Sequence, residues 1–105
     1  MLITTTNVVE GRPVQEYLGV INAQSIIGAN IFKDIFAGLR DVFGGRSKTY
    51  EKVLEQAKED ALRELTEKAQ AIGANAVIGV DLDFETVGSG GSMLMVIATG
   101  TAVRI

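Results

Sequence analysis

The sequence predicts an α+β domain of two layers, in which an antiparallel sheet is covered by a long amphipathic helix and a shorter helix. Two observations favour this class. From residue 49 to residue 72, apolar residues recur in steps of three and four, which is the period of a helix packed along one face. Near the C-terminus, two apolar runs over 76–86 and 93–105 flank a glycine- and serine-rich stretch, as the strands of a hairpin do. A chain of 105 residues has room for one core, so we expect a single domain over residues 1–105.

Two strands are expected before the helices. Residues 4–9 read as a short strand that ends at the turn-forming stretch EGRP. Residues 14–27 read as a longer strand, and both of its faces are partly apolar. That pattern is typical of a strand covered on two sides, or covered on one side by another subunit. One face of this strand would carry Val14, Glu16, Leu18, Val20 and Asn22.

The two helices come next. Asn30 is a suitable N-cap for the shorter helix, whose apolar face runs from Ile31 to Phe43 and ends at a glycine pair. The long helix over 49–72 keeps one apolar side for about six turns at 3.6 residues each, and Gly73 ends it. Its apolar positions are Tyr50, Val53, Leu54, Ala57, Ala61, Leu65, Ala69 and Ile72.

The composition argues against several classes of function. A net charge of −3 disfavours a nucleic-acid partner, because such proteins need clustered Lys and Arg. The chain has no cysteine and no histidine, which removes thiolate chemistry and the commonest general base and transition-metal ligand. We therefore expect no cofactor and no enzymatic activity, with a carboxylate-based hydrolase as the remaining enzymatic alternative. Since no apolar run reaches the length of a membrane span and the start lacks a signal peptide, we expect a cytoplasmic protein with no membrane partner.

Three acidic residues form the first candidate site. Asp81, Asp83 and Glu85 alternate with apolar residues, so they should share one face of the strand over 76–86 with Val77 and Gly79. Neighbouring carboxylates on that face would lie roughly 6.5 to 7 Å apart along the strand. Such a row could hold a hard cation such as Ca²⁺ or Mg²⁺, line a pore in a ring, or simply face water. The opposite face, toward the long helix, would carry Ala76, Ile78, Val80, Leu82 and Phe84.

The start of the long helix is the second candidate site. Arg46, Ser47 and Thr49 follow the glycine pair, where free backbone N–H groups and a positive dipole end could bind an anion. The alternatives are an ordinary helix start, or an ion pair between Arg46 and an acidic residue of a neighbouring subunit.

The stretches EYLGVINAQSIIGAN, RSKTYEKVLEQAKEDAL, GANAVIGVDLDFETVG and MLMVIATGTAVRI closely resemble the YbjQ-like family, over essentially the whole chain. The resemblance implies a small bacterial cytoplasmic protein with a dodecin-like subunit fold that assembles into a homopentameric ring. It also implies a label of heavy-metal binding. Soft metals prefer thiolate and imidazole ligands, and here only Met1, Met93 and Met95 offer sulfur. A methionine pair on an apolar strand is more typical of core filling, so a soft-metal site is not expected.

Together these features predict a ring-forming homo-oligomer that serves as a binding or structural module, with a small ligand or ion at its subunit junctions. The strands over 76–86 and 93–105 are apolar on both faces, whereas one helical layer covers only one face. The expected partners are therefore further copies of this chain and a small ligand or cation. The alternative is a metal-binding protein that holds a divalent cation through Asp81, Asp83 and Glu85.

Overall fold

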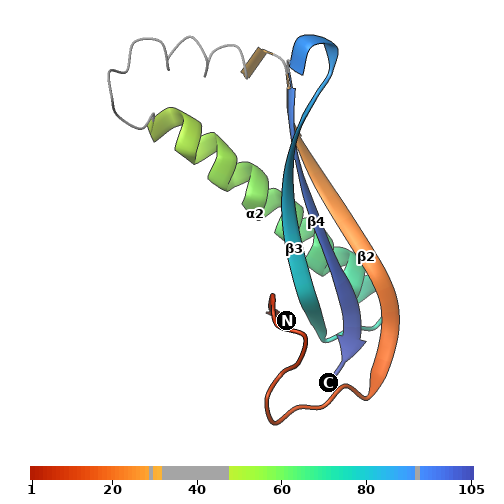
Figure 1. The fold of residues 1–105 in the computed structure, drawn as a ribbon. Helices are drawn as coiled ribbons and strands as arrows, with labels where there is room; N and C mark the ends of the chain where they lie inside the picture. Colours follow the sequence, from red (N-terminus) through yellow and green to blue (C-terminus); the bar gives the residue numbers. More distant parts are fainter. Residues whose placement is uncertain (29, 32–47, 92) are drawn as a thin grey trace.

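The computed structural model describes residues 1–28, 30–31, 48–91 and 93–105. The α+β class is confirmed: one long helix lies against a sheet of four strands (Figure 1). Of the predicted shorter helix, Asn30 and Ile31 are helical, and the rest lies outside the described residues. The elements are β1 (Leu2–Ile3), β2 (Glu16–Ile27), α2 (Lys48–Ala71), β3 (Ala76–Val87), the 3-10 turn η1 (Ser89–Gly91) and β4 (Met93–Arg104).

The strand order in the sheet is β1-β3-β4-β2. β3 and β4 form the predicted antiparallel hairpin, and β2 pairs with the other side of β4, also antiparallel. β2 and β3 therefore run in the same direction and form the two long edges of the sheet (Figure 1). β1 pairs with the start of β3 in parallel, so the sheet is mixed. The sequence predicted a wholly antiparallel sheet, and this part of the prediction is wrong.

The predicted strand over residues 4–9 is wrong, because the ladder ends at Ile3 and the chain bends over residues 5–7. Threonine side chains compete here with the ladder for backbone partners. The hydroxyl groups of Thr4 and Thr6 lie 2.9 Å apart, and the Thr6 hydroxyl donates to the Val8 carbonyl at 2.7 Å. The bent segment still lies along β3, since the Thr4 N–H donates to the Val77 carbonyl at 3.0 Å.

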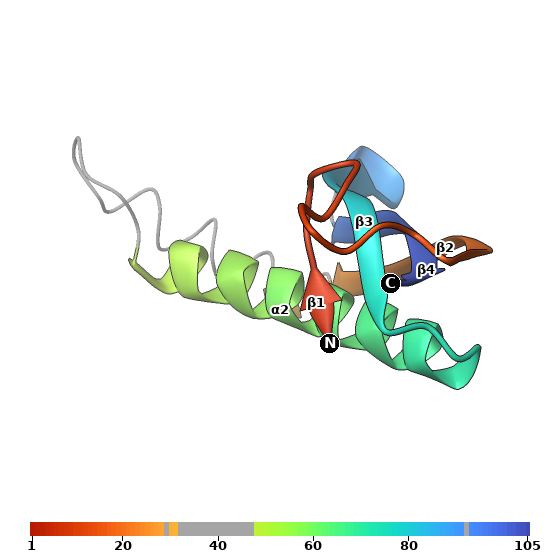
Figure 2. The ribbon, with the colours of Figure 1, turned by 90° about the horizontal axis from the view of Figure 1, so that it is seen from below.

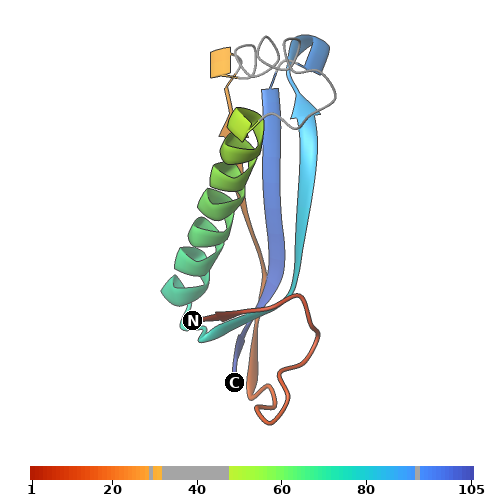
Figure 3. The same ribbon diagram turned by 90° about the vertical axis from the view of Figure 1, so that its left-hand side faces the viewer.

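α2 begins and ends within one residue of the prediction and packs mainly over β2 and β4, leaving β3 farther away (Figure 3). Its small alanine side chains let the helix lie close to the strands. Its fully buried positions, Ala61, Leu65 and Ala69, confirm the predicted apolar stripe. They share one core with Ala23 and Ile27 of β2 and with alternate residues of β4. The β4 members of this core are Leu94, Val96, Ala98 and Ala102.

Two bulges at glycines change which residues face the helix. Gly19 in β2 and Gly79 in β3 have φ angles of 118° and 60°, which favour glycine, and the ladder register shifts at both places. Past Gly19, Ile21 faces the core, while Val20 is 76% exposed. The prediction that Leu18 and Val20 share a face is therefore wrong, because Leu18 packs against the core.

The bulge at Gly79 has the same effect on β3. Val77 and Val80 belong to the core under α2, whereas Ala76 and Ile78 lie on the opposite face, contrary to the prediction. There they form a second, smaller core with Val103. The N-terminal segment crosses this side of the sheet, opposite α2 (Figure 2), and supplies part of the cover. The residues packed against this smaller core are Val9, Val14 and Ile105.

Candidate functional site

Beyond the smaller core, the side of the sheet opposite α2 has no cover in the described part of the chain. Side chains that lie opposite each other on β3, β4 and β2 form rows across this side, and the pairing register of the strands determines which residues share a row. The first row is Asp81, Thr99 and Asn22; the second is Asp83, Ile97 and Gln24; the third is Glu85, Met95 and Ile26. We call these nine residues, together with Val20 and Met93, the open face. None of its members is buried.

The three carboxylates lie on the open face, so their predicted orientation away from the helix is found in the structure. Their neighbours on that face differ from the prediction, because the bulge at Gly79 places Ala76 and Ile78 there instead of Val77. The pKa of Asp83 is raised above its ordinary value of 3.8, first by a hydrogen bond with Asp81 and then by the negative charge of Asp81. Partial desolvation and the charge of Glu85 add to the effect. The row is therefore a set of like charges that interact with one another.

A metal site within one subunit needs ligands that converge. Among the described residues, no group of three or more His, Cys, Asp and Glu is placed to hold a metal ion. A cation site on Asp81, Asp83 and Glu85 stays a prediction, and it would need further ligands from another copy. Met93 and Met95 share the open face as predicted, and each is half-buried.

The predicted anion site is only partly covered by the structure. Thr49 lies in the first turn of α2, at the end where free N–H groups are expected. Arg46 and Ser47 lie outside the described residues. Anion binding by these three residues stays a prediction.

Two hollows between α2 and β3 were not apparent from the sequence. One, of about 360 Å³, opens between the N-terminal segment, Leu62 of α2 and Leu82 of β3. The other, of about 370 Å³, lies between Leu54 and Phe84, and Phe84 is 49% exposed. Alternation predicts that Leu82 and Phe84 face the helix, but it cannot predict that α2 is displaced toward the other edge of the sheet.

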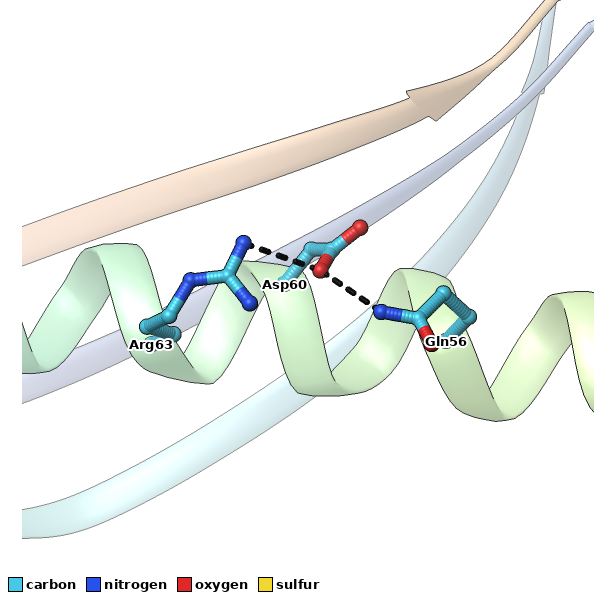
Figure 4. A network of polar contacts seen from close by, with 3 residues as sticks. All are labelled: Gln56, Asp60 and Arg63. Atoms are coloured by element: carbon cyan, nitrogen blue, oxygen red, sulfur yellow. Dashed lines mark hydrogen bonds and ion pairs between the residues drawn. The ribbon is translucent and has the colours of Figure 1, made fainter.

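The exposed side of α2 pairs its charges internally. Asp60 accepts a hydrogen bond from Gln56 at 2.9 Å and forms an ion pair with Arg63 at 3.0 Å (Figure 4). Lys68 also forms a polar contact with the sheet, because its Nζ donates to the backbone carbonyl of Asn22 in β2 at 2.8 Å. Lys68 therefore links the end of α2 to the edge of the sheet. No helix in the described part of the chain is both long and apolar enough to cross a membrane.

Comparisons with known proteins cover the whole chain. Residues 1–105 match the YbjQ family model, whose description is "Putative heavy-metal-binding". Two proteins called UPF0145 protein, from the NA1000 / CB15N and CB 15 strains of Caulobacter vibrioides, are each 59% identical over 103 residues, covering 98% of both chains. A crystal structure from Pediococcus pentosaceus, titled a protein with unknown function of the DUF74 family, has a similar fold. It aligns with a TM-score of 0.66 at 21% identity, over 100% of this chain and 97% of that one. None of these descriptions names an enzymatic activity.

Proposed function

This chain belongs to the YbjQ-like family, and from that premise we propose that it assembles into a pentameric ring that holds a small ligand or ion where its subunits meet. The observation that carries the proposal is the open face. Val20 and Ile26 are 76% and 55% exposed on it, next to the half-buried Met95 and Ile97. Apolar side chains gathered on one surface are typical of a contact with another molecule.

The two covers of the sheet explain why a second copy fits this surface. α2 occupies one face, and among the residues that the structure describes, the N-terminal segment covers the end of the other face, around Ile78 and Val103. The remaining part of that face is apolar along β4, and a strand apolar on both sides needs a cover on both sides. The same chain in further copies supplies such a cover, which is the assembly that the family resemblance implies.

The chemistry of the open face favours a ligand that binds to oxygen. Asp81, Asp83 and Thr99 offer oxygen ligands, and copies of this face around a ring would bring carboxylates of several subunits into one region. A cation, or a ligand with several hydrogen-bond donors, would offset the resulting repulsion between the carboxylates. Thiolate and imidazole ligands are absent from the sequence, so the ligand proposed here is a hard cation or an oxygen-binding molecule and not a soft metal.

Native mass spectrometry of protein purified without added metal tests the proposal. We expect one dominant assembly of 11.2 kDa subunits at micromolar concentration, with extra mass from any ligand kept at the junctions. A stable monomer under these conditions would contradict the ring. A bare assembly without extra mass would retain the ring and remove the tightly held ligand from the proposal.

Divalent-cation binding is a second candidate, and the raised pKa of Asp83 favours it. Since the neighbouring carboxylates destabilise the charged form of Asp83, a cation bound among them would stabilise that form. Calorimetric titration with Ca²⁺ and with Mg²⁺ tests this candidate. The triple variant Asp81→Asn, Asp83→Asn, Glu85→Gln should lose the binding heat of the parent protein.

A matched triple variant on the exposed side of α2 controls for the change in total charge. It consists of Glu59→Gln, Glu64→Gln and Glu67→Gln, and it should keep the binding heat. Cation binding at the row is rejected if the parent protein gives no heat, or if the open-face variant binds as the parent does.

A further inference from the structure

We infer that the two long edges of the sheet pair with each other between copies, so that β2 of one subunit adds to β3 of the next. This inference rests on the proposed ring, for which it supplies the contact between neighbours. Edge strands carry unpaired N–H and C=O groups that can accept another strand. Here the two edges differ in the length of their unpaired stretch and in the charges beside it, and these differences determine which edges can pair between copies.

The edge of β3 is partly occupied. As far as Val80 it is bonded to the N-terminal segment: the Gly79 N–H donates to the Thr6 carbonyl at 2.8 Å, and the Val80 N–H to the Thr4 carbonyl at 3.1 Å. Over residues 81–87, no strand in the described part of the chain pairs with this edge. The free stretch is therefore the one that carries the carboxylates.

β2 pairs with β4 along one side from Glu16 to Ile27, and its other side forms the second long edge of the sheet. On its outer side, Lys68 Nζ holds the Asn22 carbonyl. A lysine at a strand edge is a common way to discourage unspecific pairing, and a flexible side chain can exchange this bond for another. Asn22 and Gln24, both exposed, present carboxamide donors along this edge.

The charges select one of the three ways in which such edges can pair. Joining two β3 edges would bring two carboxylate rows together, and like charges on adjacent strands destabilise a sheet. Joining two β2 edges would bring two Lys68 ammonium groups together. Joining β2 to β3 instead continues the open face from one copy to the next, and it places the Asn22 and Gln24 amide donors beside the Asp81 and Asp83 carboxylates of the neighbouring copy.

The strand directions also fit this choice. β2 and β3 run the same way within a subunit, so a rotation about an axis along the strands continues the sheet as a parallel pair. The contact uses different surfaces on the two partners, and such a contact closes into a ring when the rotation between neighbours divides a full turn.

Disulfide trapping tests the contact, since the chain has no cysteine of its own. The double variants Asn22→Cys/Asp81→Cys and Gln24→Cys/Asp83→Cys examine the register within a row. Asn22→Cys/Asp83→Cys and Gln24→Cys/Asp81→Cys examine the adjacent registers. Within one subunit β4 separates the two edges, so the paired positions lie about 9.6 Å apart, beyond the roughly 7 Å that a disulfide spans.

We expect at least one double variant to give, after mild oxidation and denaturation, a covalent ladder that ends at the subunit number found by native mass spectrometry. The four single-cysteine variants and the control Asn22→Cys/Glu64→Cys, which uses an exposed helix position, should give no ladder. Dimers from a single-cysteine variant would mean that like edges pair, which overturns the inference. If the protein assembles but no double variant forms a disulfide, the edge pairing is overturned and the proposed ring is retained. If the parent protein is a monomer, the edge pairing and the ring are both overturned.

Discussion

Gly100 of β4 lies so close to Val77 of β3 that a β-carbon on Gly100 would be 2.6 Å from Val77 Cγ1. The same atom would lie 3.1 Å from Val80 Cγ2 and 3.3 Å from the Ile78 carbonyl oxygen. Gly100 faces the buried side of β4, directly across from the bulge in β3. The absence of a side chain there is what allows both valines to fill the core at the bulge.

Gly100→Ala should therefore destabilise the fold. The added methyl group overpacks a close-packed site, a change that costs about 1–3 kcal/mol. Urea unfolding at fixed protein concentration measures this effect as a lower midpoint with an unchanged slope. Gly28→Ala is the control, since nothing lies within 4 Å of a β-carbon there. Equal midpoints for Gly100→Ala and the parent protein would contradict the packing described here.

Leu65 is the largest side chain of α2 that is fully buried. Leu65→Ala should lower the free energy of unfolding by about 2–5 kcal/mol, because it removes apolar contacts and leaves a cavity between the helix and the sheet. Thermal and urea unfolding measure the loss. Leu54→Ala, at a half-buried position beside a hollow, should cost distinctly less, and an equal cost would mean that α2 packs differently from the structure.

The position of Leu65 could be predicted from the sequence, whereas the position of Val77 could not. The helical period fixes which side of α2 is apolar, whatever the helix packs against. In a strand the period is two, so one extra residue exchanges the faces of everything beyond it. Glycines within strands, such as Gly19 and Gly79, are a signal for bulges, but the sequence does not tell which residue leaves the ladder.

The same reasoning applies to the candidate site. Alternation suffices to place Asp81, Asp83 and Glu85 on a common face, because beyond Gly79 the period of two holds again. Their neighbours across the sheet depend on the registers in which β4 and β2 pair, and the pattern of one strand does not reveal those registers. The interaction of Asn22 with Lys68 was equally out of reach, since it joins residues 46 positions apart through the packing of the helix.

The open face should respond to charge without loss of the fold. Val20→Asp replaces a side chain that is 76% exposed in the subunit, so folding requires little adjustment, while a charge there should prevent burial against another copy. We expect native mass spectrometry and sedimentation to detect smaller species, with the far-ultraviolet circular dichroism of the parent. Val8→Asp, also at an exposed valine but on the N-terminal segment, should leave the assembly intact. An unchanged assembly for Val20→Asp would exclude this part of the open face from the contact.

Asp83, which lies beside the carboxylate of Asp81, makes the stability of the subunit depend on pH. The raised pKa of Asp83 means that the folded state binds its proton more tightly than the unfolded chain does. Between the ordinary pKa of 3.8 and the raised one, the folded state holds more protons, so stability decreases as the pH rises through that window. Above the window Asp83 is charged and the repulsion that its neighbours exert on it is fully present, whereas below the window Asp83 is protonated and this repulsion is absent.

Asp83→Asn should accordingly raise the thermal unfolding temperature at pH 7, because the asparagine cannot carry the charge that Asp81 and Glu85 oppose. At pH 3 the parent protein has Asp83 mostly protonated, so the difference between the two proteins should largely disappear. Added salt at pH 7 should also reduce the difference, since these side chains are exposed and their interaction is screened. Glu67→Gln on α2 controls for the loss of one negative charge elsewhere on the surface. A gain for Asp83→Asn that is equal at pH 3 and pH 7 would mean that hydrogen bonding or packing, and not repulsion within the carboxylate row, accounts for it.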